Sequence, residues 1–397
     1  MNNYNNSYSS FSQQIKNIIS SYNSENRKNF SNQLSSAKVY IYGAGNAGTM
    51  TYYLLKELNI EIEGFMDKRA DSLTSHLNKP VHRADADNLN ADLKGNSFVI
   101  IALLCSYEEL QDIKEGLLKL GYKNSCYYHD IYNLVITENI TKENFSSYNL
   151  NNHKDIHTDI ILKNTQEKVL NVANSLCDEK SREVYYNFLN AILNSNPDLF
   201  SPPDQEKQYF VNDISFAKGY SRFIDCGTYD GDTVFALKQC KKSVDKVALF
   251  EPESNNFKKL RENLNGSRVA NEEILFPCGV WKETEILRFK AGIQSSSAIS
   301  PAGDMFIQCV ALDDVLRDFA PTFIKMDIEG AEYEALLGAE NIIRQYAPDL
   351  AVSVYHKIEH MWEIPLLIQS FNSNYKFYLR CHALHGMETI LYATCEE

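Results

Sequence analysis

The chain has 397 residues, 44% of them hydrophobic and 23% charged, a composition typical of globular proteins with a packed core. This length predicts two or three domains. The formal net charge of −13 argues against a nucleic-acid partner, which would require a basic face. No apolar run long enough for a membrane span is present, and no basic-then-apolar leader opens the chain. The nine scattered cysteines are typical of reduced thiols, so we expect a cytoplasmic protein.

Residues 1–36 are rich in Asn and Ser. Apolar residues at helical spacing predict one amphipathic helix there, surrounded by loose polar chain: Phe11, Ile15, Ile18 and Ile19. From 37 to 135, apolar runs such as "KVYIY" and "SFVIIALLC" alternate with amphipathic stretches. This alternation predicts a small Rossmann-like unit of three or four parallel strands covered by helices.

The first strand of this unit runs into the glycine turn "IYGAGNAGTM", which has the GxGxxG spacing and no acidic residue. The helix N-terminus behind such a turn permits a phosphate. Asp67 follows at the distance where an acid binds ribose. The unit resembles the N-terminal nucleotide-sugar-binding domain of bacterial sugar acyltransferases, which implies a nucleotide site at Gly43, Gly45, Asn46, Gly48 and Asp67. The alternative is that this unit binds no ligand and serves as a scaffold or as a dimerisation domain. A homodimer is therefore left open.

Residues 136–215 are predicted to form a polar linker and two helices, within "TQEKVLNVANSL" and "SREVYYNFLNAILNS". From 216 to 397, strands and helices alternate again, so the fold class is predicted as α/β in both units. Strands are expected at 221–226, 246–251, 273–279, 322–327 and 350–356, followed by an antiparallel hairpin around "LHGM".

The second strand–turn–helix stretch, "RFIDCGTYDGDTVFAL", has three acids around its glycine turn: Asp225, Asp230 and Asp232. A pyrophosphate beside these carboxylates would meet like-charge repulsion costing several kcal/mol. A ligand that carries an ammonium and a sulfonium suits the turn better, and S-adenosylmethionine (SAM) is such a ligand. Glu251 ends the next strand, twenty residues after Gly231, where an acid can accept hydrogen bonds from both ribose hydroxyls. A solvent-facing acid at a strand end is the alternative for Glu251.

Five segments together resemble the FkbM family of SAM-dependent O-methyltransferases, over about residues 205–395: "FIDCGTYDGDT", "LFEPE", "IKMDIEGAEYEALLGA", "SVYHK" and "LRCHA…ETILYA". The resemblance implies a class I methyltransferase fold with seven strands, the last antiparallel, and methylation of a hydroxyl, usually on a sugar. It also implies that the cofactor is bound by Asp225, Gly227, Thr228, Gly231, Asp232, Thr233, Glu251, Pro252, Gly279 and Val280.

Methyl transfer requires an aligned acceptor oxygen and a base for its proton. Ligands of open α/β sheets lie beyond the carboxyl ends of the strands, where Asp327 and His356 are expected, with Glu329 close behind. We predict that these three are catalytic. Three alternatives stay open. Asp327 could only cap the following helix, His356 and His360 could ligate zinc, and Asp327 and Glu329, with or without His356, could hold Mg²⁺.

The acceptor is predicted to contact four further residues that match family positions near the pocket: Ser296, Arg380, His382 and Tyr209. A structural role is the alternative for Arg380 and His382, and an ordinary hairpin loop is the alternative for the segment of Ser296. The leading hypothesis is therefore a methyltransferase that acts on a sugar or nucleotide-linked sugar, in surface polysaccharide synthesis. The second hypothesis is a nucleotide-sugar oxidoreductase or epimerase with a regulatory SAM-binding domain. This hypothesis calls for a Tyr-x-x-x-Lys pair that faces a nicotinamide. The pair with that spacing, Tyr52 and Lys56 in "YYLLK", lies on the first helix, where it cannot face one.

Overall fold

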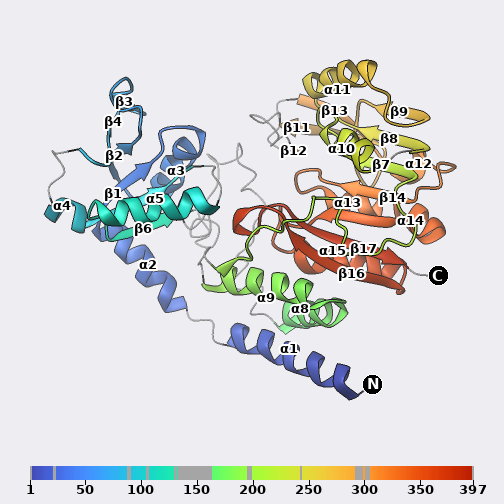
Figure 1. Cartoon of the computed structure of the whole chain (residues 1–397), viewed down its shortest axis with the longest axis horizontal. Coiled ribbons are helices and arrows are strands. Elements are labelled where there is room, and N and C mark those ends of the chain that lie inside the picture. Colours follow the sequence, from blue (N-terminus) through green and yellow to red (C-terminus); the bar gives the residue numbers. More distant parts are fainter. Residues whose placement is uncertain are drawn as a thin grey trace.

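The computed structural model describes residues 2–20, 24–86, 91–103, 107–128, 131, 163–194, 199–241, 244–290, 298–299 and 305–395. Two large sheets, each covered by helices, lie in separate parts of the molecule (Figure 1). The first comes from the amino-terminal third of the chain and the second from the carboxy-terminal half. Both contain mainly parallel strands, so the predicted α/β fold class is confirmed.

The amino-terminal sheet has the strand order β3-β4-β2-β1-β5-β6, with all neighbours parallel except β3 and β4. Its strands are β1 (Lys38–Tyr42), β2 (Ile62–Met66), β3 (Ser75–His76), β4 (Lys79–His82), β5 (Ser97–Ile101) and β6 (Asn124–Tyr127). The expected count of three or four strands was therefore wrong. Strands β3 and β4 are short and polar and flank a tight turn in which Leu77 and Asn78 have positive φ, so no apolar run announces them.

Helices α3 (Asn46–Glu57), α4 (Ala91–Gly95) and α5 (Tyr107–Lys119) accompany this sheet. Residues 1–36 contain two helices, α1 (Asn2–Ser20) and α2 (Ser24–Ser36), rather than the single helix predicted. The predicted apolar face of α1 is buried at Phe11, Ile15, Ile18 and Ile19. It packs on α8 (Lys163–Ser175) and α9 (Glu179–Asn194), at the other end of the molecule from the first sheet (Figure 1).

The carboxy-terminal sheet has seven strands in the order β16-β17-β15-β14-β7-β8-β9. They are β7 (Arg222–Cys226), β8 (Lys246–Phe250), β9 (Glu272–Phe276), β14 (Phe323–Met326), β15 (Asp349–Ser353), β16 (Tyr375–Cys381) and β17 (Thr389–Cys395). Strand β17 runs antiparallel to both of its neighbours, β15 and β16. Helices α8 and α9 join the free edge of β16, where Leu379 N donates to Ser181 Oγ at 2.8 Å.

The connections of this sheet are α10 (Asp232–Cys240), α11 (Ser254–Gly266), α12 (Leu312–Val315), α13 (Glu332–Leu337), α14 (Glu340–Tyr346), α15 (His360–Phe371) and the 3-10 turn η4 (Leu384–Gly386). A second, smaller sheet with the order β10-β13-β11-β12 lies beside the ends of β8 and β9. It contains β10 (Gly279–Val280), β11 (Glu285–Lys290), β12 (Ala298–Ile299) and β13 (Met305–Val310).

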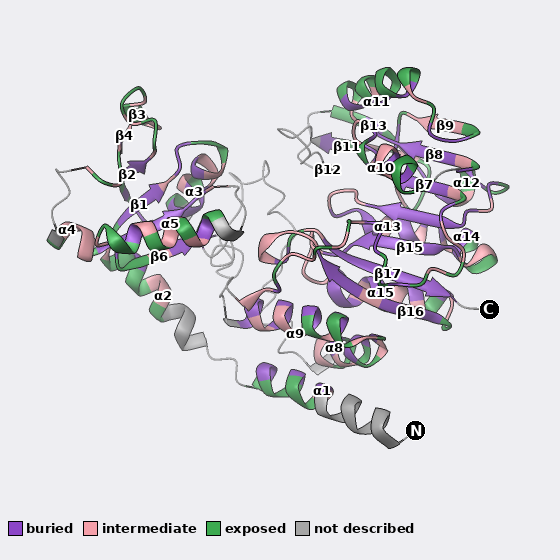
Figure 2. Cartoon of the chain, in the orientation of Figure 1, coloured by how far each residue is buried: buried purple, intermediate pink, exposed green. Residues whose placement is uncertain are grey.

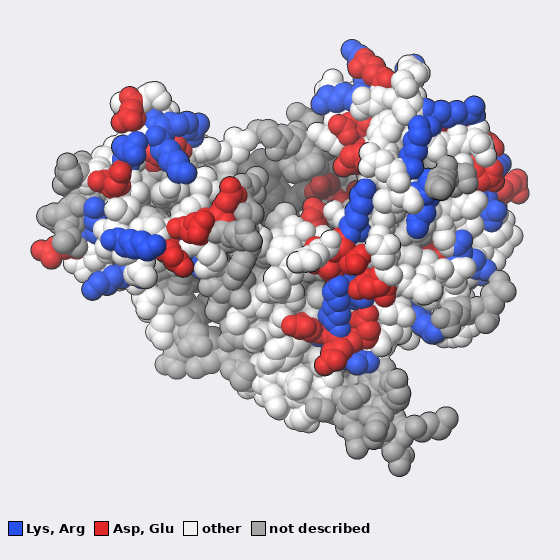
Figure 3. Space-filling model, viewed as in Figure 1, with Lys and Arg blue, Asp and Glu red and all other residues white. Residues whose placement is uncertain are grey.

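The inner parallel strands β7, β8, β14 and β15 are buried on both faces, as their near-continuous apolar runs require, whereas the edge strand β9 is only partly buried (Figure 2). Such a sheet fixes the ends of its strands rigidly, and these ends position the site described next. None of the helices in the described part of the chain is both long and apolar enough to cross a bilayer. Lys and Arg are interspersed with Asp and Glu over the face seen in Figure 3.

Candidate active site

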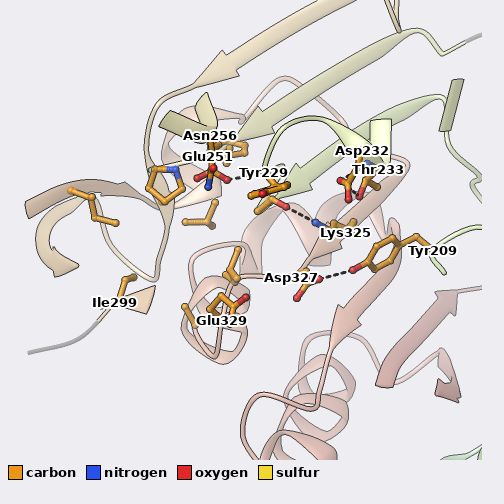
Figure 4. Close-up of a pocket in the computed structure, with 18 of the residues that line it drawn as sticks. Tyr209, Tyr229, Asp232, Thr233, Glu251, Asn256, Ile299, Lys325, Asp327 and Glu329 are labelled. Carbon is orange, nitrogen blue, oxygen red and sulfur yellow. Dashed lines mark hydrogen bonds between the residues drawn. The ribbon is translucent and has the colours of Figure 1, made fainter. Parts of the chain in front are cut away.

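A pocket lies at the carboxyl ends of β7, β8 and β14, where the strand order of the sheet reverses direction. Its cavity of about 520 Å³ suits a small-molecule ligand. The polar side chains that line it are Gln208, Tyr209, Tyr229, Asp232, Thr233, Glu251, Asn256, Lys325, Asp327, Glu329, Tyr355 and Glu388 (Figure 4).

The glycine turn 227–231 forms one wall of the pocket. Gly227 has φ 84°, and a Cβ at this position would lie 1.9 Å from the carbonyl oxygen of Asp327, so no other residue fits. Gly231 has φ 98° and caps α10. Thr228 is buried and its Oγ1 donates to the carbonyl oxygen of Asp225. The turn therefore exposes backbone to the pocket, while the Thr228 side chain stabilises the turn itself.

Asp225 does not face the pocket, which corrects the electrostatic argument made from the sequence. Its side chain is fully buried, and its Oδ1 lies 2.9 Å from Lys325 Nζ. Lys325 also donates to the carbonyl oxygen of Gly227 at 2.6 Å. Burial raises the pKa of Asp225 to about 6, although Lys325 opposes that shift.

The pocket is nevertheless acidic, because five other carboxylates line it: Asp232, Glu251, Asp327, Glu329 and Glu388. Among the described lining residues, Lys325 is the single Lys or Arg, and its charge is matched by Asp225. Of the three acids named around the second glycine turn, Asp232 is among the described lining residues and Asp225 is not.

Glu251 directly follows β8 and lies at one end of the pocket, beside Tyr229 and Asn256 (Figure 4). Its Oε2 accepts from Tyr229 N at 2.9 Å, and its Oε1 accepts from Glu253 N at 2.8 Å. Asn256 is a further hydrogen-bonding neighbour of this carboxylate. Because the two carboxylate oxygens have four lone pairs in total, acceptor capacity remains for a hydroxyl donor. Burial raises the pKa of Glu251 to about 7. Pro252, Gly279 and Val280 line the pocket nearby.

Asp327 follows β14 directly and lies at the other end of the pocket. Its Oδ2 accepts from the Tyr209 hydroxyl at 2.7 Å (Figure 4). Helix α13 begins at Glu332 and makes no side-chain cap hydrogen bond, so the alternative in which Asp327 caps this helix is wrong. Tyr209 comes from the segment before β7, and its contact with Asp327 brings it into the pocket as predicted.

Glu388, Gln208 and Tyr355 complete this end of the pocket and were not found from the sequence. Glu388 Oε2 accepts from Gln208 Nε2 at 2.6 Å, and its Oε1 accepts from the Tyr355 hydroxyl at 3.1 Å. Glu388 directly precedes β17. Because β17 is antiparallel, its first residues lie at the same edge as the carboxyl ends of the other strands. The predicted hairpin was therefore the signal that could have identified Glu388.

His356 follows β15 and lies behind Asp327 and Glu329, so it is not among the lining residues. Its Nε2 is 3.6 Å from Asp327 Oδ1 and 3.6 Å from Glu329 Oε2. Its Nδ1 is 2.9 Å from Oε1 of the fully buried Glu332, whose Oε2 is 3.4 Å from His360 Nδ1. Glu332 and the two other acids raise the pKa of His356 to about 10 against the effect of burial. Glu332 was not predicted.

Two residues predicted to bind substrate lie elsewhere. Arg380 is only 1% exposed, and its guanidinium pairs with Asp178 at 2.7 Å and with Asp213 at 2.9 Å. Both acids come from the part of the chain between the two sheets, which also contains helix α9 packed against β16. His382 Nε2 lies 2.9 Å from the Tyr392 hydroxyl. Neither Arg380 nor His382 is among the described residues lining the pocket, so we correct this assignment; Ser296 lies outside the described residues.

The first glycine turn is built for close packing. A Cβ on Gly48 would lie 1.9 Å from the carbonyl oxygen of Gly43. Asp67 Oδ1 accepts from Arg69 N and Arg69 Nε, while Oδ2 accepts from Ala44 N and Arg69 Nη2. These four bonds use the four lone pairs of the carboxylate, and they hold the pKa of Asp67 well below its usual range. In contrast to Glu251, Asp67 has no capacity left for ribose hydroxyls in this arrangement, which contradicts its predicted role.

Residues 225–379 match the family model described as the methyltransferase FkbM domain. The crystal structure of methyltransferase FkbM from Methylobacillus flagellatus KT covers 98% of this chain and 98% of its own, with a TM-score of 0.73 and 21% identity. That likeness establishes the fold. A tRNA (uracil-54, C5)-methyltransferase from Pyrococcus abyssi, solved with S-adenosyl-L-homocysteine, is 10% identical and covers 44% of this chain and 34% of its own. Its TM-score of 0.25 is too low to support an argument. The comparison with curated proteins finds no match.

Proposed function

Because residues 225–379 carry an FkbM methyltransferase domain, we propose that this chain transfers a methyl group from SAM to a hydroxyl of a sugar or nucleotide-linked sugar. The observation that carries the proposal is the pocket itself: Glu251 at one end has acceptor capacity for ribose, and Asp327 and Glu329 stand at the other end. We further propose that the chain divides at about residues 36, 135 and 215, which the separation of the two sheets supports.

The charge of the pocket supports SAM over a phosphorylated coenzyme. Five carboxylates line the pocket, and the described lining supplies only the paired Lys325 to offset them. A diphosphate would add at least two negative charges among these groups, at a cost of several kcal/mol. A sulfonium and an ammonium are instead attracted by them.

The chain's residues divide into three groups around such a cofactor. Glu251 would accept the ribose hydroxyls, Gly279 and Val280 would contact the adenine ring, and the turn at Gly227 with Asp232 and Thr233 would hold the methionine end. SAM supplies an electrophilic methyl group on a positively charged sulfur that leaves as a neutral thioether.

The acceptor oxygen uses a lone pair to form the new C–O bond as the C–S bond breaks toward sulfur, and its proton leaves to a base on the enzyme. Asp327 and Glu329 are the lining carboxylates at that end of the pocket, and His356 lies 3.6 Å behind both. Burial raises the pKa of Glu329 to about 7, which suits a proton acceptor working near neutral pH. Tyr209 holds the other oxygen of Asp327 in place.

A sugar acceptor is favoured by the remaining polar groups. Gln208, Tyr355 and Glu388 offer both donors and acceptors to hydroxyl groups. A carboxylate or phosphate close to the methylated hydroxyl would meet Asp327, Glu329 and Glu388. Surface polysaccharide synthesis in the cytoplasm is the setting we propose, and the eight cysteines of the described part of the chain are free thiols.

The oxidoreductase or epimerase alternative requires a working nucleotide site in the amino-terminal unit. Asp67 is saturated by Arg69 and Ala44, so this alternative requires a rearrangement at the first glycine turn. Calorimetry with S-adenosylhomocysteine tests the proposed cofactor site at Glu251 and, through a variant of Arg69, whether the first glycine turn contributes to it. We expect S-adenosylhomocysteine to bind to the chain, to bind much more weakly to Glu251→Ala, and to bind unchanged to Arg69→Ala.

The acceptor is tested with SAM, free sugars, and GDP- and UDP-linked sugars, by following release of S-adenosylhomocysteine and the mass of the product. Methylation of a free or nucleotide-linked sugar supports the proposal. Binding of NAD in place of S-adenosylhomocysteine would overturn it.

A further inference from the structure

His356 is held rigidly by a buried acid. Its Nδ1 donates to Glu332 Oε1 at 2.9 Å, and the same oxygen accepts from Ile328 N at 2.9 Å and Gly330 N at 3.2 Å. Glu332 is 0% exposed and the His356 side chain only 10%. A carboxylate that accepts from Nδ1–H fixes the imidazole ring so that Nε2 points in a defined direction, the arrangement found behind metal-ligating histidines.

His356 Nε2 is buried and has no hydrogen-bond partner among the described residues. The groups it faces are Asp327 Oδ1 and Glu329 Oε2, each at 3.6 Å. That separation is too long for a hydrogen bond. Ligand-to-metal bonds of about 2.0–2.2 Å place neighbouring ligand atoms roughly 3.0–3.5 Å apart. The two separations from Nε2, to Asp327 Oδ1 and to Glu329 Oε2, are therefore close to the spacing of neighbouring metal ligands.

We propose that Asp327 Oδ1, Glu329 Oε2 and His356 Nε2 bind one divalent metal ion whose remaining positions face the pocket. Ligand atoms of Asp327, Glu332 and His356 also lie within 4.8 Å of one another. Because Glu332 Oε1 already accepts three donors, we assign Glu332 the positioning of His356 and not the metal. Two carboxylates and one imidazole suit ions that accept both oxygen and nitrogen, such as Mn²⁺, Fe²⁺ or Zn²⁺, better than Ca²⁺.

The backbone of Glu329 supports a ligand role. Its φ of 56° lies in the left-handed region, which a non-glycine residue adopts at a cost of about 1–2 kcal/mol. Strain of this kind persists where the surroundings over-determine the conformation, and it gathers at functional sites. Here the strained turn directs the Glu329 carboxylate toward Nε2 and the pocket.

The role of the ion rests on the proposed function. Bound beside the acceptor end, it would contact a hydroxyl oxygen and lower the pKa of that hydroxyl, so that Asp327 or Glu329 could take the proton. Two adjacent hydroxyl groups could occupy two positions of one ion. The substrate class that this predicts is a vicinal diol, and the methylated oxygen would be one of the pair.

The test uses tag-free, chelator-treated full-length chain and Mn²⁺, with electron paramagnetic resonance reporting free and bound ion. We expect one Mn²⁺ per chain. Asp327→Asn, His356→Gln and the positioning variant Glu332→Gln should each weaken binding by about 10- to 100-fold. Asp232→Asn, an acid at the opposite side of the pocket, should bind Mn²⁺ as the unmodified chain does.

A measurement on the unmodified chain removes the dependence on variants that fold poorly. Electron spin echo modulation of bound Mn²⁺ should show one imidazole nitrogen. Absence of stoichiometric Mn²⁺ binding, binding that survives His356→Gln, or an echo without nitrogen modulation would each overturn the proposal, and would leave His356 as a protonated partner of the two acids. Calorimetry with S-adenosylhomocysteine separates the two proposals: cofactor binding without Mn²⁺ retires the metal alone, and Mn²⁺ binding without the cofactor retires the methyltransferase.

Discussion

Lys325 and Asp225 form an ion pair inside the seven-stranded sheet, with 2.9 Å between Nζ and Oδ1 and side chains 3% and 0% exposed. They lie directly opposite each other on the neighbouring strands β14 and β7. Lys325 also holds the carbonyl oxygen of Gly227, so the pair fixes the glycine turn from behind. This arrangement gives the first prediction.

Replacing Lys325 with Met should destabilise the chain by about 3–5 kcal/mol at pH 8, because Asp225 is left as an unpaired buried charge. The pKa of Asp225 is raised to about 6 even with Lys325 present, and removing Lys325 raises it further. A raised carboxyl pKa favours the folded state at low pH and loses that contribution as pH rises through it. The cost should thus be much smaller at pH 5.5. Urea unfolding at both pH values measures this, and equal losses would contradict it.

The double variant Asp225→Leu with Lys325→Met is the matched control. Replacing both partners of a buried pair by apolar groups is often neutral or stabilising. We expect it to recover most of the stability that Lys325→Met loses.

Binding of S-adenosylhomocysteine should strengthen as pH rises through about 7. Burial raises the pKa of Glu251 to about 7, so the carboxyl is protonated below this value and loses acceptor capacity for ribose hydroxyls. Glu251→Gln should abolish the pH dependence and weaken binding roughly 10- to 100-fold, as expected for lost hydrogen bonds to a charged group. Calorimetry between pH 5.5 and 8.5 checks both effects; a profile that Glu251→Gln leaves unchanged would place the titrating group elsewhere.

Asp327→Asn should keep affinity for S-adenosylhomocysteine and lower turnover by about 10²- to 10⁴-fold, the usual contribution of a proton acceptor. The reason is its position at the acceptor end of the pocket, away from Glu251 (Figure 4). Asp318→Asn, which changes an exposed acid, is the control and should leave both quantities unchanged. An equal loss of cofactor affinity and turnover would show that Asp327 binds the cofactor instead.

Glu329→Gly should be more stable than Glu329→Ala by about 1 kcal/mol, because glycine adopts φ 56° without the penalty that alanine incurs. Both variants remove the carboxylate, so both should lose turnover. Thermal or urea unfolding of the two proteins isolates the backbone strain from the charge. Equal stability would mean that the turn relaxes when the side chain is removed.

The sequence identifies pocket residues at the ends of strands well, and it identifies the buried residues that support them poorly. Glu251 and Asp327 lie where the ends of apolar runs placed them, because parallel strands end at one edge of a sheet. Asp225 was misassigned because a strand buried on both faces has no polar alternation to show which way its side chains point. Sequence alone did not indicate that Lys325 faces it across the sheet.

Residues brought together by long-range packing were also missed. Glu332, Glu388 and Gln208 come from three separate segments, and each has an ordinary polar context in the sequence. Arg380 was assigned to the acceptor from a family position. The acids that bury it, Asp178 and Asp213, lie about 170–200 residues earlier in the chain, and no local pattern connects them.

The position of β17 between β15 and β16 links parts of the molecule that lie far apart in the sequence. Strand β16 joins the hydrogen-bonded sheet only through β17, which is made after every other strand of that sheet. Helix α9 docks on β16, helix α8 docks on α15, and α1 docks on α8 and α9. Helix α1 is therefore held through α9 by strands that come more than 350 residues later in the chain, and the segment just before β17 also supplies Glu388 to the pocket.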